Sequence, residues 1–266
     1  MMKLKKEITP KEPYPIEGFI DTHIHTSPDI KPRLLTDVEA AIDAKEERMN
    51  SIVIKSHYEP TSGRAIIASE LTDFPVYGGV VLNNSVGGLN VDAVKSAARI
   101  GGKFVWFPTV SCSSIQINWS HVEDILHVVK ENQMVIATGH LKSADIFTLL
   151  DKAKSLGIWR IIINHPLTKV VGASLDEQVE MSAYAYLEHC FVACMERHDN
   201  LDPVLIKDSI KKIGANRCLM ATDFGQLFNP RPINGMKMFI NSMIREGISI
   251  DEIDLMCKDN PHKLIN

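Results

Sequence analysis

Histidine and aspartate residues recur directly after short apolar runs of this sequence. "GFIDTHIHTSPD" places His23 and His25 two positions apart, and Asp223 follows the apolar run in "RCLMATDFG". His140 in "VIATGH" and His165 in "IIINHP" stand in the same relation to their own runs. Imidazole and carboxylate groups bind zinc, manganese or iron. These five residues are therefore the candidate ligands of a divalent metal ion.

The spacing of the first pair has a physical meaning. Side chains two positions apart on a β-strand point to the same face, so His23 and His25 can reach one ion while Ile24 packs on the other face. Such a pair also arises by chance in a chain with 10 histidines among 266 residues. The same coincidence at five strand ends is much stronger evidence for a site.

A lysine closes the second apolar run, "SIVI", and His57 follows it. The Lys55 ammonium would be costly to bury unless it were paired or neutral. Carboxylation of its amine would make it an anionic metal ligand, whereas otherwise it pairs with Glu188 or Asp223 or reaches solvent. Glu188 in "AYLEHCFVA" has three open roles: a metal ligand, a partner that holds a histidine ring, or the counter-ion of Lys55.

The segment "SHYEPTSGRAIIASE" predicts an anion pocket next to the site. Ser62 and Gly63 would offer backbone N–H groups at a helix amino terminus, and Arg64 would add two-pronged recognition of a carboxylate or phosphate. His57 lies just before them and is a further candidate for substrate binding. The alternative is an ordinary helix cap with a surface arginine.

The elements that must position these residues form a regular series. Short apolar runs with strand character alternate with longer amphipathic segments, which indicates βα units and a parallel sheet. Eight such pairs predict a (β/α)8 TIM barrel, with the active site at the carboxyl ends of the strands. A doubly wound open sheet is the alternative, but no GxGxxG follows the first strand. The expected strands span residues 18–24, 51–56, 75–83, 103–110, 133–139, 159–164, 185–193 and 217–223.

Composition sets the broad class of the protein. With 45% hydrophobic and 23% charged residues, the chain predicts a single-domain barrel over residues 17–266 after a solvated N-terminal arm, 1–16. A net charge of -4 argues against a nucleic-acid partner. The arm has no signal-peptide core and no run is long enough to span a membrane, so a cytoplasmic protein is expected. We expect a small-molecule substrate and leave a homo-oligomer open.

At these residues the sequence resembles the amidohydrolase superfamily of metal-dependent hydrolases. The resemblance rests on "DTHIHT", "GH", "NHP" and "ATDFG", together with the closing "NPHKL". It implies that His23, His25 and Asp223 bind a metal, and that Asp223 also accepts the proton of the attacking water. His140 and His165 would bind a second ion or, with a single ion, act as one ligand and one contact to water or substrate.

The chain departs from that superfamily at the fourth strand. Two-metal members carry a bridging carboxylated lysine or glutamate there, whereas "KFVWFPTV" ends near Pro108 and Thr109. Either Lys55 or Glu188 would have to replace it. One or two ions are therefore compatible with the sequence. Zinc is the first expectation, and manganese or iron would accept the same ligands.

The resemblance predicts hydrolysis of a C–N or C–O bond in a small anionic substrate. A divalent ion lowers the pKa of a bound water toward 7 and polarises the group under attack. Three alternatives remain. They are a metal-dependent decarboxylase or lyase on the same barrel, a phosphoesterase of the polymerase-and-histidinol-phosphatase type, and a non-catalytic binding barrel. Gly225 stands where that phosphoesterase family has a histidine, which counts against the phosphoesterase. All five principal ligand positions are present, which counts against a non-catalytic barrel.

Overall fold

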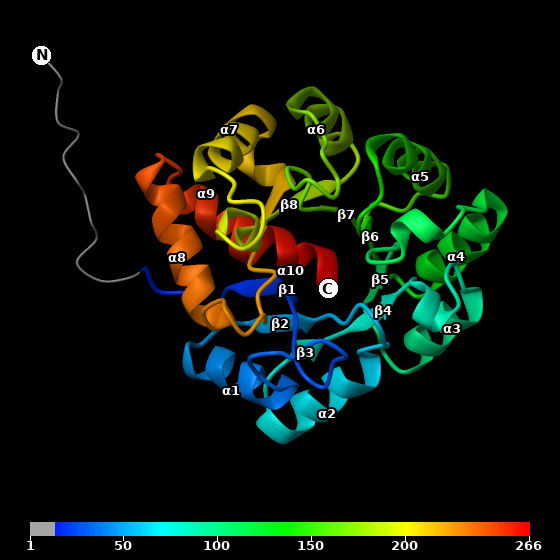
Figure 1. Ribbon diagram of the computed structural model, residues 1–266, viewed down its shortest axis with the longest axis horizontal. Helices are drawn as coiled ribbons and strands as arrows, with labels where there is room; N and C mark the ends of the chain where they lie inside the picture. The colour runs from blue at the N-terminus through cyan, green and yellow to red at the C-terminus, as the bar shows by residue number, and fades with distance from the viewer. Residues whose placement is uncertain (1–13) are drawn as a thin grey trace, which may run out of the picture.

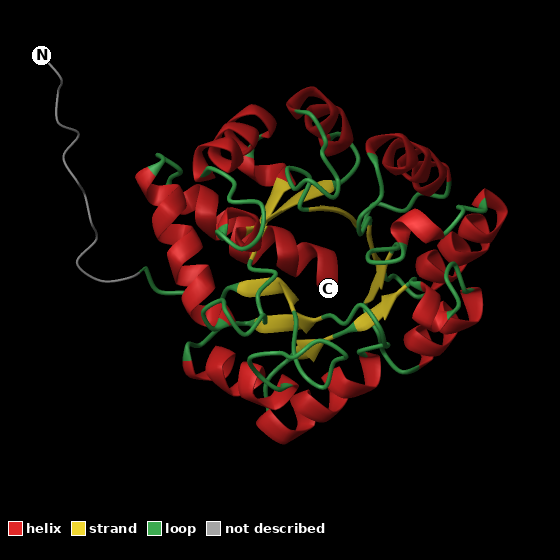
Figure 2. Ribbon diagram, in the orientation of Figure 1, coloured by secondary structure: helices red, strands yellow, loops and turns green. Residues whose placement is uncertain are grey.

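The computed structural model describes residues 14–266 and has the expected (β/α)8 barrel (Figure 1). A ring of helices surrounds the inner ring of strands (Figure 2). Of the N-terminal arm predicted over residues 1–16, residues 1–13 lie outside the described part of the chain. Ile16 does not belong to a solvated arm, because its side chain is buried in the core.

Parallel strand segments form the barrel wall. The third expected strand is interrupted at Gly78, so that its first half pairs with β2 and its second half with β5. A Cβ atom on Gly79 would lie 1.9 Å from the carbonyl oxygen of Phe104, so only glycine permits this close pairing. The segments are β1 Ile20–Ile24, β2 Ser51–Ile54, β3 Val76–Tyr77, β4 Gly79–Val81, β5 Phe104–Trp106, β6 Val135–Ala137, β7 Ile161–Asn164, β8 Tyr186–Cys190 and β9 Cys218–Ala221.

Backbone hydrogen bonds join the first strand to the last. The amide of Asp223 donates to the carbonyl of His23, and the amide of His25 donates to the carbonyl of Phe224, both at 2.8 Å. The ends of β1 and β9 therefore lie side by side. This contact brings the two ligand-bearing segments together from opposite ends of the sequence.

The eight amphipathic segments all form helices, seven of them between strands and the eighth after β9. Thr36 and Ser174 begin two of them with capping boxes, in which the side chain accepts from the third backbone amide. None of the helices in residues 14–266 combines the length and apolar character that a membrane-spanning segment needs. They are α1 Asp37–Glu46, α2 Ser62–Thr72, α3 Val91–Arg99, α4 Trp119–Glu131, α5 Ser143–Ser155, α6 Leu175–Ser182, α7 Pro203–Ile213 and α8 Pro232–Arg245; α9 Ile250–Asp254 and α10 Asn260–Ile265 follow.

The carboxyl-terminal helix closes one end of the barrel. Leu264 and Ile265 pack among apolar side chains of the barrel strands, including the stacked pair Phe104 and Trp106. The Asn260 amide donates to the carbonyls of Ala215 and Cys218, just before and at the start of β9. In Figure 2 this helix lies across the ring of strands. Polar chemistry is therefore confined to the opposite end, where the strands finish.

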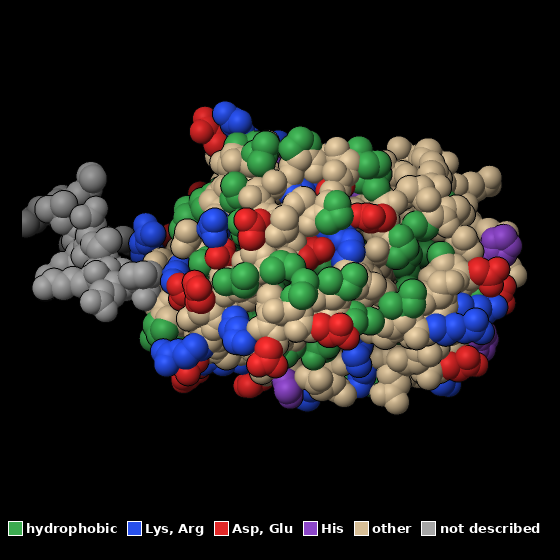
Figure 3. Space-filling model, turned by 90° about the horizontal axis from the view of Figure 1, so that it is seen from below, with side chains coloured by type: hydrophobic (Ala, Val, Ile, Leu, Met, Phe, Trp, Pro, Cys, Tyr) green, Lys and Arg blue, Asp and Glu red, His purple; other side chains and the backbone are tan. Residues whose placement is uncertain are grey.

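The outer face over α1 and α2 carries mixed side chains (Figure 3). Positive and negative groups alternate there with apolar side chains. Ile67 and Leu71 are 59% and 70% exposed, respectively. A homo-oligomer stays a prediction.

Candidate active site

His23 and His25 both face the barrel interior, while Ile24 packs outward against the helices. The pairing register between β1 and β2 shifts between Asp21 and Ile24. This irregularity lets neighbouring residues share a face, so that Thr22 and His23 both reach Glu188. The orientation expected from the His-x-His spacing is present.

The side chains of His23, His25 and Asp223 converge on one point. Nε2 of His23 lies 3.4 Å, and Nε2 of His25 3.1 Å, from the same Asp223 oxygen. Ligand atoms about 2.1 Å from a tetrahedral ion are themselves about 3.4 Å apart. The three groups fit a divalent ion without rearrangement of the backbone, and their role as ligands stays a prediction.

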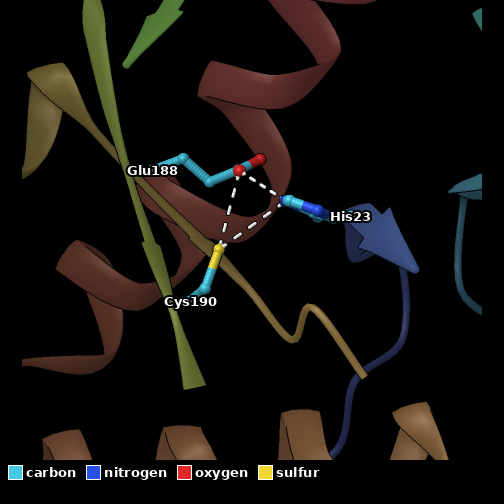
Figure 4. Close-up of side chains that lie close together, drawn as sticks. All are labelled: His23, Glu188 and Cys190. Carbon is cyan, nitrogen blue, oxygen red and sulfur yellow. Dashed lines mark hydrogen bonds and ion pairs between the residues drawn. The ribbon is translucent and has the colours of Figure 1, made fainter. Parts of the chain in front are cut away.

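Glu188 holds the His23 ring in place (Figure 4). One of its oxygens accepts from Thr22 at 2.6 Å, and the other accepts from His23 Nδ1 at 2.9 Å and from Asn164 at 2.8 Å. Burial alone would raise the pKa of Glu188, but His23 and these hydrogen bonds lower it. Both oxygens of Glu188 already accept hydrogen bonds. The geometry therefore favours the role of holding the His23 ring over the roles of metal ligand and of counter-ion to Lys55.

Cys190 makes a second cluster with the same two residues. Its Sγ lies 3.6 Å from Glu188 Oε2 and 3.8 Å from His23 Nδ1 (Figure 4). Burial raises the pKa of this thiol well above its usual value. A metal here would have to displace the hydrogen bond between Glu188 and His23 and also the proton of the thiol. The group around Asp223 is the better metal site.

The imidazoles of His25, His57, His140 and His165 are neutral. Desolvation by burial lowers the pKa of His25 and of His140 to about 3, and it lowers the pKa of His57 and His165 well below the usual value. Burial would raise the pKa of Asp223, but His23 and His25 lower it, so this group is a carboxylate. Neutral rings and a carboxylate provide the lone pairs that a metal requires.

Hydrogen bonds fix where the proton of His165 lies. The Thr168 hydroxyl donates to the His165 carbonyl at 2.7 Å, so its oxygen accepts from Nδ1 of the ring at 3.1 Å. Nε2 of His165 is therefore the unprotonated nitrogen. It can act as a ligand or a proton acceptor.

His57 presents the opposite tautomer. Asn83 donates to the Thr109 hydroxyl oxygen at 2.7 Å, which leaves the hydroxyl proton to be donated to His57 Nδ1 at 2.8 Å. The proton of the ring then lies on Nε2. His57 thus presents an N–H group and is a poor metal ligand, and its substrate-binding role stays a prediction. The sequence offered no signal for the contribution of Thr109 or Asn83.

Unusual backbone conformations hold the ligand-bearing loops. His165 and Asp223 have φ values of 29° and 55°, in the left-handed region that non-glycine residues rarely adopt. A Cβ atom on Gly225 would lie 1.8 Å from the carbonyl oxygen of His25, so this position requires glycine.

Asp21 is a positioning residue that the sequence did not reveal. Its carboxylate accepts from the backbone amides of His23 and Thr222 and thereby joins β1 to β9.

Lys55 points into the site, as the second strand was expected to contribute. Its side chain is buried, and its Nζ lies 3.0 Å from Nε2 of His23. Desolvation by burial lowers the pKa of Lys55. Because Glu188 accepts the proton on Nδ1 of His23, the amine donates to the lone pair on Nε2. Lys55 therefore competes with a metal for this nitrogen and has to move when an ion binds.

A cavity of about 520 Å³ lies above these residues. His25, His57, His140, His165 and Asp223 line its inner part. The sequence gave no reason to place His198 here, because its loop reaches the cavity only in the folded barrel. The outer wall includes Lys31, Arg33, Thr168, Val170, Val192, His198, Asp199, Gln226, Leu227 and Phe228.

The predicted anion pocket at Ser62, Gly63 and Arg64 is wrong. The Arg64 guanidinium donates to both oxygens of Asp37 at 2.8 Å and to Glu59 at 2.5 Å. None of the three residues lines the cavity, and Ser62 is buried with its hydroxyl near Gly102. Arg64 clamps the loop after β1 to α1 and α2 because two carboxylates face it, which the local sequence does not reveal.

Replacing Arg64 with Met should destabilise the fold and leave the site intact. Removal of the guanidinium leaves the nearly buried Asp37 carboxylate without its partner, which should lower the free energy of unfolding by about 2–3 kcal/mol. Denaturant unfolding measures the change. Lys45→Met, which breaks an exposed pair with Asp73, should cost less than about 1 kcal/mol. Equal effects of the two substitutions would contradict the clamp.

Comparison with known proteins supports the fold. The model of a family described as "Family of unknown function (DUF6282)" matches residues 18–188. Among curated protein sequences, no significant match is found. Three solved structures superpose over most of both chains at low sequence identity, so they are evidence for the fold alone.

An organophosphorus hydrolase from Deinococcus radiodurans gives a TM-score of 0.62 at 13% identity, covering 96% of this chain and 98% of that one. A 2,6-dihydroxybenzoate decarboxylase complexed with 2,6-dihydroxybenzoate gives 0.61 at 10%, covering 94% and 99%. A putative 2-pyrone-4,6-dicarboxylic acid hydrolase from Pseudomonas putida gives 0.60 at 14%, covering 93% and 97%. The (β/α)8 barrel expected from the eight strand and helix pairs is confirmed.

Proposed function

Because the chain belongs to the family of unknown function DUF6282, we propose its activity from the site: it is a metal-dependent hydrolase of a small molecule with a C–N or C–O bond. The observation that carries the proposal is the convergence of His23, His25 and Asp223, of which His25 and Asp223 line a cavity of about 520 Å³. Structural features of this kind, with neutral imidazoles and an oriented ring, are typical of catalytic metal centres.

A single ion fits these residues best. Two groups of mutually close ligand atoms occur in residues 14–266, and neither includes His140 or His165. The fourth strand expected from the sequence, which is β5 in the structure, supplies no bridging acid. Both oxygens of Glu188 accept other hydrogen bonds. Three protein ligands leave an open position, as in catalytic zinc sites. Zinc is the first choice of metal, and Lys55, carboxylated or free, would be the nearest additional ligand.

The surrounding residues have separate tasks. A bound divalent ion would lower the pKa of water and polarise the bond under attack. Asp223 accepts the proton of the attacking water, and the Nε2–H of His57 donates to the substrate. His140 and His165 line the same space and contact water or substrate. The C–N or C–O bond then breaks, and the leaving amine or alcohol takes the proton.

Metal analysis together with product analysis tests the proposal. We expect about one zinc, manganese or iron ion per chain, lost on dialysis against a chelator, and metal-dependent turnover of lactones, esters or amides. Reaction in ¹⁸O water should place one labelled oxygen in the acid product. Chelation that leaves turnover unchanged would overturn the proposal.

A decarboxylase on the same barrel is the second candidate. The single-ion geometry and the similar fold of the 2,6-dihydroxybenzoate decarboxylase favour it. Release of carbon dioxide from a carboxylic acid without uptake of labelled oxygen would replace the hydrolase assignment with this one.

A further inference from the structure

Arg33 is a cavity-lining cation that the proposed reaction leaves without a role. Its side chain is only 4% exposed, and its Nε donates to the buried Asp29 carboxylate at 2.7 Å. The amide of Leu34 donates to the carbonyl of Gly225, which fixes this loop against the loop that follows β9. The guanidinium is therefore held rigidly beside the site.

The other edge of this guanidinium faces a candidate metal ligand. Nη2 of Arg33 lies 3.4 Å from Nδ1 of His25. Nε2 of the same ring lies 3.1 Å from the Asp223 carboxylate. A neutral imidazole has one proton, and these contacts place it on Nε2, with the lone pair on Nδ1 accepting from Arg33.

Metal binding would reverse this tautomer. A ligand to a metal uses its lone pair, so an ion on Nε2 of His25 requires the ring proton to sit on Nδ1. The Nδ1–H and the Nη2–H of Arg33 would then be two donors directed at each other. Among residues 14–266, no side chain bonded to either group can accept from both, because Asp29 accepts from Nε. An acceptor from outside the protein, a water molecule or a group of the substrate, would satisfy both donors.

We infer that the substrate carries a carboxylate, and that Arg33 and the Nδ1–H of His25 receive it together. The inference rests on the proposed metal site and names the substrate class for it. A carboxylate has two oxygens in one plane, one for each donor.

Binding of benzoate and of its uncharged isostere benzamide to the full chain tests the inference, with and without zinc. With zinc bound, Arg33→Met should weaken benzoate about 10- to 100-fold and benzamide less than about 3-fold. Arg231→Met is the matched control, because Arg231 also pairs with an aspartate, Asp43, but lies outside the cavity. It should leave benzoate affinity unchanged.

A second readout concerns the metal itself. Zinc should tighten benzoate binding in the wild type, and benzoate should tighten zinc binding by the same factor. Arg33→Met should reduce this coupling. If Arg33→Met fails to fold, Arg33→Met with Asp29→Asn removes both buried charges and takes its place.

The outcomes separate the two proposals. A wild-type chain that binds no divalent metal refutes the proposed function. If the chain binds zinc, but its benzoate affinity is the same with and without zinc and in Arg33→Met, the present inference alone is refuted. Tighter binding of phenylphosphonate than of benzoate would overturn the carboxylate assignment.

Discussion

Asp223→Asn should abolish metal-dependent activity while the barrel stays folded. The amide has no negative charge for the ion and cannot accept the proton of water. We expect metal affinity to fall about 100-fold or more and kcat/KM to fall about 10³- to 10⁴-fold. Asparagine tolerates the left-handed conformation at this position, where φ is 55°, so the loop should keep its shape. Metal titration and steady-state kinetics measure the two losses.

Asp199→Asn is the matched control for this substitution. Asp199 lines the same cavity, but its carboxylate accepts from the backbone amide of Lys169 and is not among the grouped ligand atoms around His23 and His25. Its replacement should leave metal affinity within about 3-fold of wild type, since it removes no metal ligand. If Asp223→Asn retains full metal content, the assignment of the carboxylate as a ligand fails.

Glu188→Gln should weaken the metal site without removing a ligand. Glutamate accepts from Thr22, His23 and Asn164, whereas glutamine places two N–H groups among those donors. The ring of His23 then loses its fixed tautomer and orientation. Loss of such a supporting carboxylate costs about 10- to 100-fold in metal affinity or activity. Competition with a chromogenic chelator measures the affinity.

Glu123→Gln controls for the loss of a carboxylate elsewhere. Glu123 pairs with Lys152 on the helix surface and has no contact with the barrel interior. Metal affinity should be unchanged in this variant. An unchanged affinity in Glu188→Gln as well would show that His23 needs no support from β8.

The barrel and its principal site were predictable because both follow from local periodicity. The alternation of apolar runs and amphipathic segments predicted all eight βα pairs, and the parity of β-strand side chains predicted that His23 and His25 face inward. The split of the third strand at Gly78 was not predictable, because it depends on how close β4 comes to Phe104. That approach is a property of the assembled sheet.

The two arginines show where sequence reasoning stops. Arg64 and Arg33 both follow strand ends, and the sequence predicted an anion receptor at Arg64 but gave no sign of one at Arg33. In the folded protein the Arg64 guanidinium donates hydrogen bonds to Asp37 and Glu59, whereas one edge of the Arg33 guanidinium faces His25. Carboxylates on other loops and helices determine which guanidinium is free to bind a ligand. Their positions depend on loop conformation, which has no periodicity in the sequence and so could not be predicted.

The sequence by itself determined the fold class and the set of metal-ligand types, because these depend on residue identity and spacing along single strands. Only the tertiary structure decided which groups share one point, which nitrogen of each histidine holds the proton, and what Glu188 does. Those properties depend on hydrogen bonds between strands far apart in the chain, such as that between His23 and Glu188. They form when the barrel closes and places β1 beside β9.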